Sequence, residues 1–154
     1  MLRQAFAERL KRAMKAKDSR TISTVRMILA ELKTRDVAAR GQGTGEDISD
    51  DEARRMLQTM IKQRRESIML YERGNRADLV QQELEEIKVI ESFLPRQLEE
   101  AEIEAAARAA IAETGAAKLS DMGKVMAALR ERHAGAIDLG RAGAIVRRLL
   151  GVTA

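Results

Sequence analysis

Apolar residues recur every three or four positions along almost the whole chain, and no stretch alternates with a period of two for long enough to form a strand. In the first such series, Leu2, Phe6, Leu10 and Met14 share one face of a helix. Six further segments repeat the pattern, so the sequence predicts an all-α fold with seven helices. They are expected at about residues 2–14, 19–40, 50–73, 76–94, 99–114, 121–133 and 139–150.

The ends of these segments carry residues that begin or end helices. Ser49 and Glu52 form a capping box at the start of the third helix. Gly74 and Asn75 supply the left-handed backbone that ends this helix and turns the chain. The glycine-rich run 41–45 is expected to be a flexible loop. It does not indicate a dinucleotide site, because it follows a helix and precedes two acids.

The single proline, Pro95, divides the predicted helices into two groups. Proline has no N–H and disfavours helix at the preceding residue, so we expect a helix to end at Leu94. The sequence therefore predicts an N-terminal domain of four helices, residues 1–95, and a C-terminal domain of three helices, residues 96–154. The second domain is close to the size at which an isolated domain is only marginally stable.

Two charged residues interrupt otherwise apolar helix faces. Arg64 lies near the centre of the apolar face of the third helix, and Glu83 lies within the apolar stripe of the fourth. Because they lie ten residues before and nine residues after Gly74, an antiparallel hairpin places them at similar height. We predict a largely buried Arg64–Glu83 ion pair. A structural role is favoured over a catalytic one, since no histidine, cysteine or third polar group is arranged with it.

The remaining composition excludes most kinds of catalytic site. The chain has no cysteine, and its one histidine, His133, is read as a helix-end residue, so no zinc-binding set is present. The acids Glu85, Glu86 and Glu91 are spread around the fourth helix and are not expected to converge. We therefore expect no metal or cofactor, and a self-sufficient enzyme is not favoured.

The sequence also bears on the cellular location. No apolar run approaches the roughly 20 residues that span a bilayer, and residues 1–17 lack the apolar core of a signal peptide. They are basic and amphipathic, as in a mitochondrial presequence, but Glu8 and the near absence of hydroxyl residues argue against that interpretation. A cytoplasmic protein is expected.

Charge is unevenly distributed along the chain, whose net charge is +4. Residues 1–40 carry eleven Lys/Arg against four Asp/Glu, residues 77–104 carry nine acids against two bases, and residues 105–154 carry eight bases against four acids. Ordinary solvated helix faces would also explain this pattern. The candidate nucleic-acid-binding residues are those of the basic C-terminal part: Lys118, Lys124, Arg130, Arg147 and Arg148. Since that part has no aromatic residue for base stacking, contact with the backbone of folded RNA fits better.

A series of short motifs runs through nearly the whole chain. They are Arg26-Met27, Lys62-Gln63-Arg64-Arg65-Glu66-Ser67, Arg76-Ala77-Asp78-Leu79 with Glu83, Phe93-Leu94-Pro95 with Gln97-Leu98, and Met122-Gly123-Lys124-Val125-Met126. In this order and spacing the chain resembles the GatB/YqeY family, and within it the stand-alone YqeY-like proteins. One departure is Phe93, where the family pattern usually has Tyr.

The resemblance implies a two-part helical fold and a role linked to tRNA. The C-terminal part of the family is shared with the tail of the B subunit of glutamine-dependent aspartyl/glutamyl-tRNA amidotransferase, which contacts the body of tRNA. Amidation and glutamine hydrolysis are carried out by other domains of that enzyme. Carbon–nitrogen ligase activity with glutamine as amido donor would therefore be inherited with the family label. Lys124 is the first residue to carry over as tRNA-facing.

Three functions thus remain open. The leading one is a tRNA-binding or tRNA-amidotransferase-associated module with tRNA as its partner. The second is a protein-interaction adaptor that uses the acidic fourth helix. The third, an amidotransferase enzyme, has no catalytic residue to support it.

Overall fold

The computed structural model describes residues 1–152. Within these residues the regular structure is helical and no strand occurs, which confirms the prediction of an all-α fold. A short π-helical turn, Arg40–Thr44, and a 3-10 turn, Leu119–Asp121, supplement the α-helices. The seven α-helices are α1 (Leu2–Ala16), α2 (Ser19–Ala39), α3 (Asp50–Arg73), α4 (Ala77–Glu91), α5 (Glu100–Thr114), α6 (Met122–Arg132) and α7 (Leu139–Val152).

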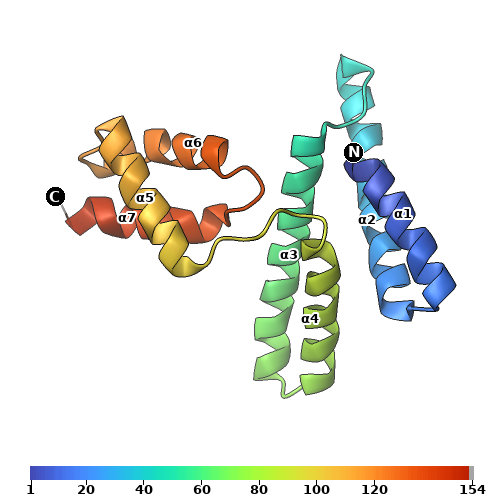
Figure 1. Ribbon diagram of the computed structural model, residues 1–154. Helices are drawn as coiled ribbons and strands as arrows, with labels where there is room; N and C mark the ends of the chain where they lie inside the picture. The colour runs from blue at the N-terminus through green and yellow to red at the C-terminus, as the bar shows by residue number, and fades with distance from the viewer. Residues whose placement is uncertain (153–154) are drawn as a thin grey trace. The chain divides into compact units, whose positions relative to one another are not determined.

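The chain divides into two compact units, Met1–Leu94 and Pro95–Ala154. The first unit consists of two helical hairpins, α1–α2 and α3–α4 (Figure 1). Its core is formed by side chains from all four helices, and the rings of Phe6 and Phe93 meet edge to face with centroids 4.8 Å apart. The largest fully buried side chains of this core are Phe6, Val25, Ile28, Met56, Leu57 and Ile90.

Local interactions explain where the hairpins begin and turn. The Asp18 carboxylate accepts the backbone N–H of Thr21 at the start of α2, and Ser49 Oγ accepts that of Glu52 at the start of α3. Asn75 has a φ of 54°, the left-handed conformation that turns the chain between α3 and α4. The glycine-rich segment after α2 begins as a π-helical turn, but its backbone leaves the helical conformation at Gly43, with a φ of 88°, and again at Gly45, with a φ of 66°.

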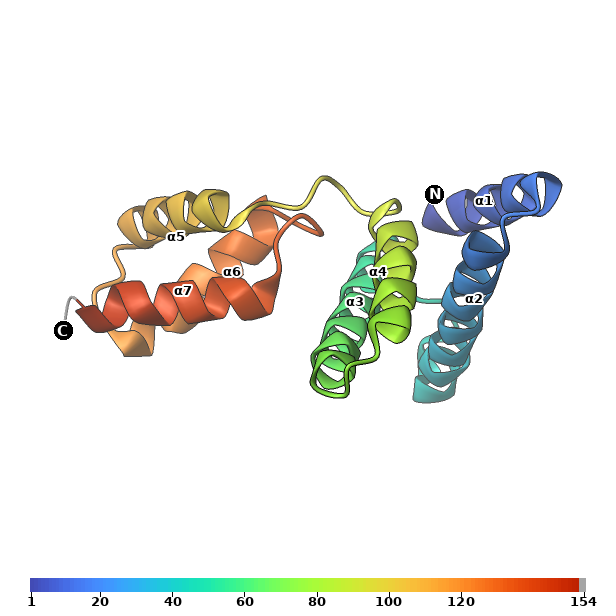
Figure 2. The ribbon, with the colours of Figure 1, turned by 90° about the horizontal axis from the view of Figure 1, so that it is seen from below.

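The second unit packs α5, α6 and α7 around a separate apolar core that contains no aromatic residue (Figure 2). The segment after Pro95 is attached to this unit, because Leu98 N–H donates to Ala136 O at 2.8 Å and Gln97 Nε2 donates to Gly135 O at 2.6 Å. Fully buried side chains of the core are Ile103, Val125, Leu129, Val146 and Leu150.

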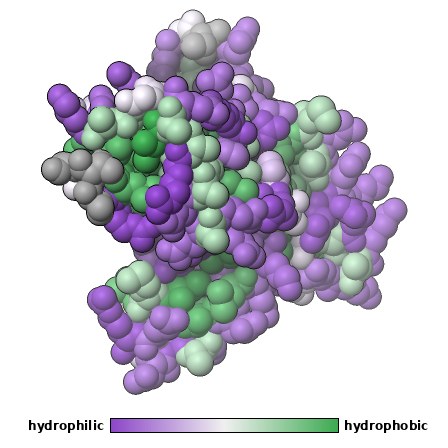
Figure 3. All heavy atoms as spheres, turned by 60° about the vertical axis from the view of Figure 1, so that its left-hand side comes forward, coloured by the Kyte–Doolittle hydropathy of each residue, from purple (hydrophilic) through white to green (hydrophobic). Residues whose placement is uncertain are grey.

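The surface is mainly polar. Hydrophilic side chains cover most of the face drawn in Figure 3, and hydrophobic ones show there as separate patches. None of the helices in the described part of the chain is long and apolar enough to cross a membrane.

Candidate functional site

Arg64 is the centre of a buried charge cluster in the first unit. The residue is 7% exposed, and its Nη1 donates to the Met60 carbonyl oxygen at 3.2 Å. Its Nε donates to Glu86 Oε2 at 3.0 Å, whereas Glu83 Oε2 lies 4.0 Å from the same nitrogen. The carboxylate nearest to the guanidinium is therefore that of Glu86, and the carboxylate of Glu83 is farther away.

Two members of this cluster were missed in the sequence. The sequence assigned Glu86 no partner, but its side chain is buried, with 6% of the residue exposed, and accepts a hydrogen bond from Arg64. Arg20 of α2 also reaches α4, with its Nη1 3.8 Å from Glu86 Oε1 and its Nε 3.1 Å from Glu85 Oε2. Glu85 and Glu86 therefore meet at Arg20, contrary to expectation, because α2 packs against α4. Glu91 does not join them, since it pairs with Arg65.

The cluster changes the acidity of Glu83. Burial raises the pKa of Glu83, and the nearby Glu86 carboxylate raises it further, while Arg64 and Arg20 act in the opposite direction. The carboxylates thus share two guanidinium groups in a partly desolvated site. Such an arrangement supports a structural function more readily than transition-state chemistry.

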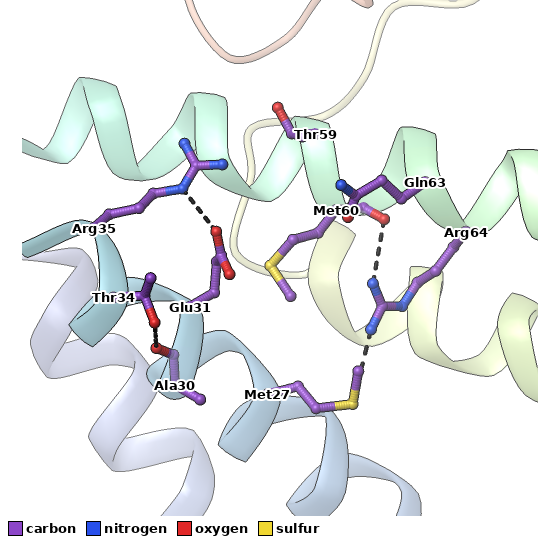
Figure 4. Close-up of a pocket in the computed structure, with 9 residues that line it drawn as sticks. All are labelled: Met27, Ala30, Glu31, Thr34, Arg35, Thr59, Met60, Gln63 and Arg64. Carbon is purple, nitrogen blue, oxygen red and sulfur yellow. Dashed lines mark hydrogen bonds and ion pairs between the residues drawn. The ribbon is translucent and has the colours of Figure 1, made fainter. Parts of the chain in front are cut away.

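A pocket of about 360 Å³ lies beside the cluster, between α2 and α3 (Figure 4). Arg64 forms part of its wall, and Arg64 Nη2 lies 3.8 Å from the sulfur of Met27. The hydroxyl of Thr34 donates to a carbonyl oxygen of its own helix, and Glu31 is paired with Arg35 at 3.0 Å. The pocket contains no nucleophile paired with a base. Among the described residues no group of acids and histidine is arranged to hold a metal ion.

Most acids of α4 form ion pairs with arginines of the same chain. Glu85 and Glu86 contact Arg20, Glu86 also binds Arg64, and Glu91 Oε1 lies 3.4 Å from Arg65 Nη2. Arginines of α2 and α3 therefore balance the negative charge of these acids. The acidic surface that the sequence suggests for a partner protein is smaller in the folded chain.

The predicted nucleic-acid-binding residues all lie in the second unit and are exposed. Lys118 precedes the 3-10 turn, Lys124 and Arg130 lie on α6, and Arg147 and Arg148 lie on α7. Lys124 Nζ is 4.0 Å from Asp121 Oδ1, and Arg148 Nη2 is 3.2 Å from Glu104 Oε2. Within the described residues, Arg130 and Arg147 have no ion pair.

The sequence of this helical chain matches the model of a known family, "Yqey-like protein", over residues 3–150. The chain belongs to the YqeY-like family. This match covers both compact units and confirms the resemblance drawn from the short motifs.

The curated relatives of this YqeY-like chain are yeast proteins named "Altered inheritance of mitochondria protein 41, mitochondrial". That of Lachancea thermotolerans is 36% identical over 98 residues, 62% of this chain and 50% of the relative. That of Kluyveromyces lactis is 32% identical over 89 residues, 58% of this chain and 46% of the relative. The matches thus span about half the length of these relatives.

These names contradict the cytoplasmic location expected from the sequence. The relatives are named as mitochondrial proteins. The expectation was wrong because it rested on the lack of a membrane-spanning run and a signal-peptide core, and on Glu8 and the few hydroxyl residues in residues 1–17, none of which identifies a compartment.

Proposed function

We propose that this YqeY-like protein binds the sugar–phosphate backbone of folded RNA through α6 and α7 of its second unit. The observation that carries the proposal is the pair of exposed arginines, Arg130 and Arg147, which lack a counter-ion among the described residues. Uncompensated Lys and Arg side chains bind phosphates and release counter-ions, which makes such binding strongly dependent on salt.

The chemistry of the second unit favours backbone contact over base recognition. It has no Phe, Tyr or Trp, so it offers no platform on which unpaired bases could stack. Phosphate contacts from Lys and Arg fix position but carry little sequence information. We therefore expect binding that depends on the shape of a folded RNA.

Transfer RNA is the ligand that the family resemblance suggests, through the tail of the amidotransferase B subunit. Amidotransferase chemistry itself has no support in the residues described above, since neither the pocket beside Arg64 nor the second unit holds a paired nucleophile and base. Carbon–nitrogen ligase activity would require other chains. The adaptor alternative is weakened because the acids of α4 are paired internally.

A filter-binding titration tests this proposal. The full chain and the variant K124Q/R130Q/R147Q are titrated with total tRNA between about 50 and 200 mM salt. The triple variant should lose about tenfold or more in affinity, and its salt dependence should become shallower by two to three counter-ions (~0.7–0.9 slope units each). The matched control is K62Q/R73Q/K88Q, which removes three exposed charges from the first unit. Absence of measurable tRNA binding by the unaltered chain at low salt would refute the proposal.

A further inference from the structure

The most uneven distribution of charge in the first unit is on α1 and the turn that follows it. Residues 9–17 contain five Lys or Arg and no acid. Four of them are exposed and form no ion pair among the described residues, and we call these four the α1 basic face: Lys11, Arg12, Lys15 and Lys17. Arg9 is not included, because it is half-buried and its charge helps to lower the pKa of Asp18.

On the other helices of this unit several arginines are paired, although Arg26, Arg55 and Arg73 are exposed and form no ion pair among the described residues. Arg20 and Arg64 are paired with the acids of α4, and Arg35 and Arg54 are paired with acids of their own helices. Two acids lie beside the α1 basic face. The Glu8 carboxylate accepts the side-chain amide of Gln4 at 3.3 Å, and the Asp18 carboxylate accepts the backbone N–H and hydroxyl of Thr21. The paired arginines thus neutralise the interior of the unit, and the exposed cations of α1 give this helix a positive outer surface.

The orientation of α1 makes this surface accessible. Leu2, Phe6 and Ala13 point into the core. At 100° per residue, Lys11, Arg12 and Lys15 fall within an arc of about 100° on the opposite side of the helix. Their positions are therefore fixed by the burial of the apolar face and not by contacts among themselves.

We propose that the α1 basic face is a second contact for the RNA backbone, outside the second unit. The inference rests on the proposed function in that it takes the same ligand, but it assigns a separate surface to it. The absence of aromatic residues from α1 apart from the buried Phe6 makes the contact one with phosphates and not with bases.

Two other anionic partners fit this surface less well. A helix that binds in a membrane interface needs a free apolar face, but that of α1 is buried in the core and leaves Met14, 51% exposed, as its one large exposed apolar side chain after Met1. Protein interfaces are depleted of lysine and are built around aromatic or apolar anchors. The α1 basic face has three lysines and no such anchor.

The test uses the full chain and three variants that each replace three exposed cations by glutamine. The first is K11Q/R12Q/K15Q on α1, the second is K124Q/R130Q/R147Q in the second unit, and the third is the control K62Q/R73Q/K88Q. Glutamine keeps the helix propensity close to that of lysine and arginine, and circular dichroism confirms that each variant is folded. Binding of tRNA and of a plain RNA duplex is measured against salt.

The α1 variant should lose about tenfold or more in affinity for both RNAs, and its salt dependence should fall by two to three counter-ions. The control should change by less than about threefold. An α1 variant that binds as tightly as the unaltered chain, while the second-unit variant is weakened, overturns this inference and leaves the proposed function standing. Loss in the α1 variant alone removes the proposed site on α6 and α7 and retains the α1 contact.

Two further arms separate the other partner classes. Phosphatidylcholine vesicles with and without cardiolipin test a membrane, and polyglutamate tests an acidic protein. Binding to either that is abolished in the α1 variant, with RNA binding unaffected by the same substitutions, would contradict an RNA contact.

Discussion

At the scale of single residues, the Arg64 cluster shows how much a buried charge depends on its partners. Burying an ion pair need not add net stability, but removing one partner leaves an uncompensated charge in a desolvated site. Arg64 is held by Glu86, and Glu83 lies 4.0 Å away, so its loss leaves two nearby carboxylates without their closest cation.

We predict that Arg64→Met lowers the free energy of unfolding by about 3–5 kcal/mol. Lys62→Met is the matched control, because Lys62 is an exposed cation on the same helix and its replacement should cost less than about 1 kcal/mol. Urea denaturation followed by circular dichroism measures both. A loss of under 1 kcal/mol for Arg64→Met would show that the cluster is solvated and not a structural pin.

Asp36 provides a second test at this scale. It is 7% exposed and accepts hydrogen bonds from Arg3 Nη1 and Nη2 at 2.7 and 2.8 Å and from the Ile48 N–H at 3.0 Å. The bonds from Arg3 are the main reason that its pKa lies below the ordinary value of 3.8. A lowered pKa contributes stability that is present above pH 3.8 and is lost as the pH falls through the folded-state pKa.

Asp36→Asn should therefore lower the free energy of unfolding by about 1–2 kcal/mol at neutral pH. The difference from the unaltered chain should shrink as the pH falls below 3.8, because Asp36 then takes up a proton in the unfolded chain while it is still charged in the folded one. It should vanish once the pH is also below the folded-state pKa. Urea denaturation across this pH range measures the difference. A gap that stays constant with pH would mean that Asp36 acts through packing and not through its ionisation.

The residues of this cluster also show what the sequence could and could not predict. The period of 3.6 residues places Arg64 on a buried face and Glu83 on the facing stripe. It does not fix how α3 and α4 are rotated against each other, and Glu86 lies just one turn from Glu83. The contribution of Arg20 depends on α2 packing across α4, a contact between residues 65 positions apart that no local pattern encodes.

At the scale of elements, two glycines of the second unit have opposite roles. Gly115 ends α5 with a φ of 69°, a conformation that other residues adopt only at a cost, and a Cβ there would meet no atom within 4 Å. Gly123 lies in the first turn of α6 and also has open space around it. Close packing of a neighbouring helix therefore does not require glycine at position 123.

We predict that Gly115→Ala destabilises the second unit by about 1 kcal/mol, because alanine is strained at this φ. Gly123→Ala should instead stabilise α6, by up to about 1 kcal/mol, since alanine has the higher helix propensity. Thermal unfolding of the two variants measures both effects. Equal shifts in the same direction would contradict this assignment of backbone roles.

At the scale of the whole molecule, the two units have separate cores and one of them contains all the aromatic residues. Phe6, Tyr71 and Phe93 lie in the first unit, and the chain has no tryptophan. Tyrosine fluorescence therefore reports on the first unit alone, whereas circular dichroism reports on helices of both. Tyrosine fluorescence and circular dichroism together thus distinguish unfolding of the two units without an added fluorescent label.

We predict that tyrosine fluorescence and circular dichroism give different unfolding midpoints. Arg64→Met should shift the fluorescence midpoint more than the part of the dichroism transition that comes from the second unit. Gly115→Ala serves as the reciprocal control, since it should alter the dichroism curve and leave the fluorescence midpoint in place. Coincident curves in all three proteins would show one cooperative unit, contrary to the two-domain organisation expected from Pro95.

The hydrogen bond from Gln97 to Gly135 has a consequence for ligand binding. Because Leu94 belongs to the first core and Gln97 is bonded within the second unit, just Pro95 and Arg96 lie between them, and Arg96 itself is paired with Glu102. A tether this short keeps the two units at an effective local concentration of about millimolar or more. Two individually weak, salt-sensitive surfaces then act as one bivalent binder, whose avidity scales with the affinity of each surface and with the effective concentration that the length of this junction sets.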